Sequence, residues 1–137
     1  GGHKMGAASD YLENKILDHI LGKVTYTAPD TVYIGLAAEV NDDGSISGEP
    51  TEASYARVAV TNNATNFPAA SNGSKSNGTD IVFGEATGDW GTVNYAFIAD
   101  ADTGGNVLLY GGLTTPKTIN SGDIVKFLTG NLTFTMD

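Results

Sequence analysis

The sequence predicts a mainly β domain, an antiparallel β-sandwich of the jelly-roll or Ig-like type, with one N-terminal α-helix. Three observations predict it. Threonine, asparagine and glycine are abundant, which suits pleated strands joined by tight turns. From residue 31 onward the hydrophobic period changes from 3.6 to 2. Turn dipeptides such as Asn-Gly and Gly-Gly separate seven or more short apolar segments, as in sandwiches and barrels.

The first element is a helix expected over residues 10–21. Asp10 and Glu13 fit a capping box in which aspartate replaces serine or threonine, and Gly22 stands where a helix commonly ends. One apolar stripe runs along this helix and consists of Leu12, Ile16, Leu17, Ile20 and Leu21. Because a helix of about 12 residues does not persist alone in water, the stripe must be buried. It covers either an end of the sheet core or a neighbouring subunit of an assembly, and we treat it as a possible partner-docking helix.

The strands follow the helix. They are expected over residues 31–37, 55–60, 81–83, 93–99, 107–113, 124–127 and 132–136. Segment 107–113 is apolar on both faces, which predicts a central strand. Alternation in 93–99 places Val93 on the same face as Tyr95 and Phe97.

The last two strands are expected to pair as a hairpin, with Leu132, Phe134 and Met136 on one face. Two polar stretches interrupt the strands. Residues 41–52 are expected to be a loop. Residues 61–79 form a longer one, whose part 69–78 is a candidate mobile or partner-binding segment.

One domain accounts for the 137 residues. Residues 1–4 precede Met5 and are expected to be a remnant of recombinant expression, so His3 is assigned no function. Residues 5–137 are then a single sandwich domain. We expect no secretory signal, because no basic segment followed by an apolar one comes after Met5.

Charge and composition exclude several classes of partner. Seven basic against sixteen acidic residues give a net charge of −9, which would repel nucleic acid and anionic membranes. No apolar run approaches the roughly 18 residues of a membrane span. The absence of cysteine excludes disulfides and thiolate chemistry.

The sequence predicts no catalytic, cofactor-binding or metal-binding residue. His19 reads as a helix-surface residue, and no Gly-x-Ser-x-Gly nucleophile elbow is present. Asp100 and Asp102 read as turn residues that cap backbone amides. Residues 41–45 resemble a calcium loop only loosely, because the glycine falls at the fourth place.

Trp90, the only tryptophan, lies between glycines at the start of a strand. We expect it to plug the end of the sandwich, because it can fold over the apolar strand that follows. The alternative is a platform for sugar stacking, in which glycan contacts come from Trp90, Tyr95 and Tyr110.

The order of these segments resembles that of a known family. The segments are YLENKILDHILG (11–22), YIGL (33–36), YARVAV (55–60), NFPA (66–69), ATGDWGTV (86–93) and DADTGGNVLLYGGL (100–113). Together they resemble a family of small structural proteins of tailed bacteriophages and prophages, often labelled phage tail fibre proteins. The resemblance covers nearly the whole chain and consists of packing and turn motifs.

The resemblance implies a non-enzymatic structural protein of a tailed-phage virion, exposed on the tail or capsid surface in a fibre or decoration role. We expect it to be made in the bacterial host cytoplasm. Its expected partners are other virion proteins and itself, as a homo-oligomer with a trimer favoured. The alternative function is a carbohydrate-binding β-sandwich module for surface adhesion, with a host surface glycan as partner.

Overall fold

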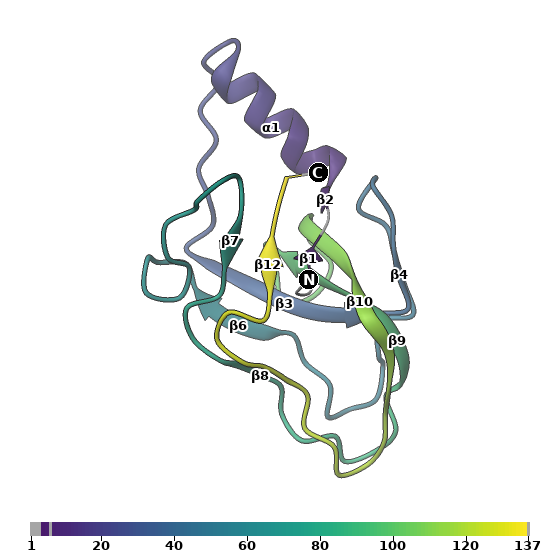
Figure 1. The fold of residues 1–137 in the computed structure, drawn as a ribbon. Helices are drawn as coiled ribbons and strands as arrows, with labels where there is room; N and C mark the ends of the chain where they lie inside the picture. The colour runs from purple at the N-terminus through teal and green to yellow at the C-terminus, as the bar shows by residue number, and fades with distance from the viewer. Residues whose placement is uncertain (1–3, 6, 137) are drawn as a thin grey trace.

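The fold is mainly β with antiparallel sheets and one helix, as the sequence predicts (Figure 1). The computed structural model describes residues 4–5 and 7–136, so the first three residues of the expected expression remnant, His3 among them, lie outside the described range. The elements in chain order are β1 (Lys4–Met5), β2 (Ala7–Ala8), α1 (Asp10–Ile20), β3 (Thr31–Ala37), β4 (Glu39–Val40), β5 (Ile46–Ser47), β6 (Val58–Thr61), β7 (Lys75–Ser76), β8 (Ile81–Val82), β9 (Gly91–Ala99), β10 (Val107–Ile119), β11 (Lys126–Phe127) and β12 (Thr133–Phe134).

Five strands form the largest sheet, in the order β2-β10-β9-β3-β6, and every neighbouring pair in it is antiparallel. A three-stranded sheet places β12 between β1 and β7, and its β1–β12 pair is parallel. β8 pairs with β11, and β4 pairs with β5. The bounds of β3 and the central position of β10 are as predicted, whereas the region 41–52, expected to be a loop, contains β5.

Both faces of the largest sheet are packed. The larger apolar cluster joins Val32, Ile34 and Leu36 of β3 to side chains of the smaller sheets. The second cluster gathers around Phe97 and includes Val40 of β4. Because successive residues of a strand point to opposite faces, the two clusters lie on either side of the sheet. The strands therefore complete their own core, an arrangement consistent with a sandwich.

A partly buried ion pair braces the second cluster. The guanidinium of Arg57 lies 4.9 Å from the ring centroid of Phe97, and its Nε donates to Glu49 at 2.8 Å. A further nitrogen donates to two carbonyls of the 100–105 turn. Burial lowers the pKa of Arg57, but the hydrogen bond and charge of Glu49 raise that pKa by more, so the group stays charged. Gly35 is required beside this stack, since a Cβ there would lie 2.3 Å from the Phe97 ring.

The face predicted for Val93 is wrong. Val93 packs in the larger cluster, on the opposite side of the sheet from Phe97. The register between β9 and β10 is irregular at this point, because Tyr95 pairs with Gly112 but Val93 pairs with Lys117. Such an irregularity breaks simple alternation.

The end predicted for β10 at residue 113 is also wrong, because the strand runs on to Ile119. Pro116, which has no amide proton, lies inside the irregular stretch between Gly112 and Lys117. Proline is tolerated in a sheet at such a bulge. The strand therefore continues through the Thr-Thr-Pro sequence, which the sequence pattern alone does not indicate.

The predicted hairpin of the last two strands is wrong. β11 pairs with β8, whereas β12 pairs with β1 and β7, so residues 128–131 connect two different sheets. Leu132 and Phe134 are buried, but Met136 is exposed, because β12 ends at Phe134.

The segment 69–78 is built into the fold in its second half. Asn72 and Gly73 both have positive φ, which is the conformation of a tight two-residue hairpin turn, and it is closed by reciprocal backbone bonds between Ser71 and Ser74. After β7, the buried Asn77 side chain donates to the Leu128 carbonyl at 3.1 Å. The segment therefore holds the 128–131 connection in place rather than standing free.

The helix matches its expected range to within one residue, but its cap is different. Ser9, not Asp10, is the N-cap, because its hydroxyl accepts the amide of Leu12 at 3.2 Å. The same hydroxyl donates to the Val107 carbonyl and fixes the helix start against β10. Gly22 follows the helix with φ +121°, as predicted. Among the described residues, no helix has the length and apolar character needed to cross a membrane.

Candidate docking surface

The predicted apolar stripe of α1 is divided along its length. Leu12 is buried in the larger cluster, and Ile16 packs against it. Beyond them Leu17, Ile20 and Leu21 are 57%, 67% and 73% exposed. Of the two predicted alternatives, burial against the sheet core therefore holds for the first half of the stripe, and packing on a neighbouring subunit stays a prediction for the second half.

A fourth apolar side chain joins the exposed half. Val24, just after the helix, is 59% exposed. We call Leu17, Ile20, Leu21 and Val24 the helix tip. Sequence reasoning missed Val24, because it follows the reversal at Gly22 and Lys23 and so lies outside the helical stripe.

The helix tip projects from the sheets (Figure 1). Gly22 and Lys23, both with positive φ, reverse the chain at the end of α1. Two bonds hold the returning segment to the helix. The amide of Val24 donates to the Asp18 carbonyl at 3.0 Å, and the amide of Tyr26 donates to Nδ1 of His19 at 3.3 Å. His19 is exposed on the helix, as predicted.

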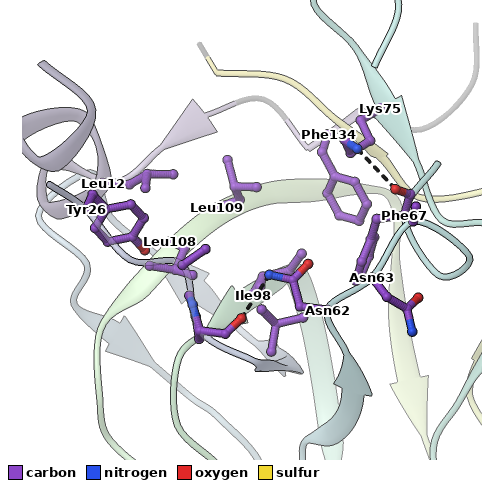
Figure 2. A pocket seen from close by; sticks show the side chains of 14 residues that line it. Leu12, Tyr26, Asn62, Asn63, Phe67, Lys75, Ile98, Leu108, Leu109 and Phe134 are labelled. Carbon is purple, nitrogen blue, oxygen red and sulfur yellow. Dashed lines mark hydrogen bonds between the residues drawn. The ribbon is translucent and has the colours of Figure 1, made fainter. Parts of the chain in front are cut away.

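A pocket of about 410 Å³ lies at the base of the helix. Its apolar lining comes from α1, β9, β10, β12 and the 62–67 segment, chiefly Leu12, Phe67, Ile98, Leu108, Leu109 and Phe134. Figure 2 shows Leu12 and Tyr26 at one end and Phe67, Phe134 and Lys75 at the other. We call it the helix-base pocket. No local sequence signal could have found it, because its walls come from segments far apart in the chain.

Two polar contacts define the rim of the helix-base pocket. Asn62 donates to the Pro29 carbonyl at 2.9 Å and closes one side. Lys75 donates to the carbonyls of Phe67 and Pro68, at 3.1 and 2.8 Å. Burial raises the pKa of Tyr26 on this rim, with smaller contributions from Tyr11 and Asp100, so its phenol stays neutral. Among the described residues that line the pocket, Lys75 is the one with a positively charged side chain.

Trp90 is buried, as predicted for a plug. It is 7% exposed and belongs to the larger cluster. Its indole N–H donates to the Ser54 hydroxyl at 3.0 Å and to Glu52 at 3.3 Å. Hydrogen bonds from Ser54, together with the indole, keep the pKa of Glu52 below its ordinary value.

The three aromatic residues of the alternative glycan site are not brought together. Tyr110 is 9% exposed and lies with Tyr95 in the second cluster, on the other side of the sheet from Trp90. Their arrangement does not present one stacking platform.

The acidic turns have structural partners. Asp100 accepts the backbone amide of Asn106 at 2.7 Å and its side-chain amide at 3.0 Å, which confirms a turn-capping role. Asp43 accepts the amide of Ser45, and the hydrogen bonds of Ser45 lower the pKa of Asp43. Within residues 4–5 and 7–136 there is no cluster of three or more histidine, cysteine or acidic side chains placed to hold a metal.

One family model matches this chain over most of its length. The model is described as Podophage GP4 fiber I protein gp80, and it matches residues 7–135. No match was found among curated proteins. The matched range contains the whole helix tip and every residue named above for the helix-base pocket.

Proposed function

We propose, from the premise that the chain belongs to the Podophage GP4 fiber I protein gp80 family, that it is a non-enzymatic building block exposed on the tail or capsid surface of a tailed-phage virion. The family match confirms the resemblance to phage fibre proteins. A fibre role is our first choice, and capsid decoration is the second form of the same proposal.

The observation that carries this proposal is the projecting helix tip on a domain whose core is otherwise complete. Four large apolar side chains stand in solvent on one short segment. Burying these side chains in a contact would stabilise that contact by about 25 cal/mol for each Å² of apolar surface removed from water. Exposed apolar groups gathered in this way mark an interaction surface. We infer that the helix tip attaches the domain to its neighbours in the virion.

The neighbours in this proposal are other virion proteins and further copies of the chain. We favour a homotrimer, because virions offer three-fold and six-fold sites and because oligomers usually close by symmetry. The acidic surface, with a net charge of −9, keeps such a particle component soluble. No observation favours the carbohydrate-binding alternative, since Trp90 is buried.

Mass spectrometry of purified particles tests the proposal. We expect peptides of this chain in the particles, in a fixed ratio to tail proteins for a fibre. A ratio close to that of the major capsid protein would indicate decoration. Absence from particles that carry the other structural proteins would contradict a virion role.

Light scattering of the purified chain tests the oligomer. We expect a mass near three times 14.2 kDa. A mass of one chain at high micromolar concentration would contradict self-association.

A further inference from the structure

We propose that the helix tip of one copy docks into the helix-base pocket of a second copy. This inference rests on the proposed function and identifies the contact through which copies assemble. The proposed contact joins two apolar surfaces that the single chain leaves exposed, the helix tip and the helix-base pocket.

The chain cannot fill its own pocket with its own helix tip. Leu12, at the base of α1, lines the pocket, but none of the four tip residues does. The helix runs away from the sheets, and the reversal at Gly22 lies at its far end (Figure 1). The start of α1 is fixed to β10 through Ser9, so the helix cannot simply fold back. A tip that enters the pocket must come from another molecule.

The tip has the spacing of a groove-binding element. Leu17, Ile20 and Leu21 lie at positions i, i+3 and i+4 at the end of α1, which is the spacing by which amphipathic helices insert anchors into apolar grooves, and Val24 follows the reversal at Gly22 and Lys23. The lining of the pocket extends from Leu12 at one end to Phe134 at the other (Figure 2). Both surfaces consist mainly of aliphatic and aromatic groups, so their contact would remove apolar surface of each from water.

The charges of the two surfaces are complementary. Lys75 is the positive charge on the pocket, and Asp18 lies in the last turn of α1, directly after Leu17 of the tip. Among the residues that the structure describes, the one ion pair joins Arg57 and Glu49, so neither Lys75 nor Asp18 has a charged partner. In a chain of net charge −9, an ammonium that is bonded to neutral carbonyls beside an apolar hollow favours an occupant that brings a carboxylate. The helix tip of a second copy is such an occupant.

The symmetry follows from the two different surfaces. The tip and the pocket are distinct parts of one chain, so each copy both donates a helix and receives one. Such a contact closes into a ring when the rotation between copies allows it, and three copies are the ring that the proposed trimer requires.

Cross-linking of mixed copies tests the contact directly, because the chain has no cysteine of its own. One batch carries Leu21→Cys on the tip, and the other carries Ala64→Cys, an exposed residue of the pocket lining. A short bis-maleimide is used, since a direct disulfide would demand a Cα–Cα separation of about 4.4–6.8 Å. We expect a product that joins one copy of each batch. Leu21→Cys mixed with Val82→Cys, exposed elsewhere on the body, is the matched control and should give none.

Other products would overturn the inference. A product formed by Leu21→Cys alone, without the mixed product, would show that helix tips pack on one another. Association of the copies with no mixed product would place the contact elsewhere. In purified particles, a cross-link from Leu21→Cys to a different virion protein only would show that the tip serves that partner. Each of these results leaves the virion role standing, whereas absence from particles would contradict that role.

A charge exchange tests the Lys75–Asp18 pair independently. Lys75→Glu and Asp18→Lys should each weaken association by about two- to fivefold, the range of a partly exposed ion pair. The double variant, which carries both changes in every copy, should restore it. Lys126→Glu, on exposed β11, should leave association unchanged. Failure of the double variant to restore association, with the single variants folded, would overturn the proposed pairing.

Discussion

The part of the chain outside α1 and the helix tip, which we call the β body, buries most of its large apolar side chains, whereas the helix tip exposes them. In the body, Trp90 is buried and its indole nitrogen has hydrogen-bond partners. In the tip, side chains of comparable hydrophobicity stand in solvent on a segment fixed at its base by Ser9. The core of the body is therefore buried within one copy, although Ile124 and Leu128 are exposed on its surface, whereas we propose that the tip is buried only in an assembly. In this protein, stability and attachment can be changed separately.

The largest effect on the body is expected from Trp90→Ala. Removing a buried aromatic side chain costs about 3–5 kcal/mol of unfolding free energy, and this change also leaves Ser54 and Glu52 without their indole donor. Denaturant unfolding followed by circular dichroism measures the loss. In the unmodified chain, the indole should emit at short wavelength and be poorly quenched by acrylamide. A stable Trp90→Ala variant, or red and freely quenched emission, would show that the residue is not part of the core.

The next largest loss of unfolding free energy is expected from Asn77→Ala, which removes the hydrogen bonds that hold the 128–131 connection between two sheets. The Asn77 side chain accepts the amide of Leu132 at 3.0 Å and donates to two carbonyls. Leaving such buried groups without partners costs about 1–3 kcal/mol. Hydrogen exchange should also show faster exchange of the Leu132 amide. Asn131→Ala, on an exposed neighbour, is the matched control. Equal stability of both variants would contradict the bracing role of Asn77.

Local patterns predicted the helix and the strand core but not the partners of the late strands. The alternation of β3 and the apolar character of β10 follow from their own residues, so both were predictable. The hairpin of the last strands was wrong because alternation fixes which face a strand buries, not which strand lies beside it. The 128–131 connection, which separates these strands, is anchored by Asn77, about fifty residues earlier in the chain.

The candidate docking surface shows the same limit. The stripe of α1 was evident from spacing, but the point at which burial stops depends on where the sheets end beneath the helix. Lys75 and Phe134 meet at the pocket rim only through the pairing of β7 with β12. Sequence therefore identified one side of the proposed contact and could not show the other.

A smaller effect is expected from Asp100→Asn combined with Asp102→Asn. Asp100 caps the turn through Asn106, and loss of such a cap costs about 1 kcal/mol. Particle assembly should be unaffected, because the turn lies in the body. Thermal unfolding and particle incorporation measure the two results. Loss of incorporation at an unchanged melting temperature would show that the turn is a contact surface.

Acid should weaken the contacts of the Trp90 indole. The pKa of Glu52 is lowered in the folded chain from its ordinary value of 4.5 by the hydrogen bonds of Ser54 and Trp90. When the pKa of a carboxyl group is lower in the folded chain than in the unfolded chain, its ionised form stabilises the folded chain at pH values above the unfolded-state pKa. This stabilisation is lost as the pH falls through the folded-state pKa. Tryptophan emission should therefore shift below pH 4.5 in the unmodified chain. Glu52→Gln should remove that part of the shift. An identical acid shift in both chains would assign it to another group.

The smallest effect on stability, and the largest on assembly, is expected from Leu17→Gln combined with Ile20→Gln. Both side chains are exposed, and glutamine favours helices about as well as the residues it replaces. The unfolding free energy of the single chain should therefore change by less than about 0.5 kcal/mol.

Ile124→Gln with Leu128→Gln removes two exposed apolar side chains from the body instead and is the matched control. Sedimentation velocity should show dissociation of the tip variant and unchanged association of the control. Equal dissociation of both variants would mean that general surface hydrophobicity, not the helix tip, holds the copies together. A tip variant whose single chain unfolds would mean that Leu17 and Ile20 support the fold of their own copy, which would contradict the separation of tip and body.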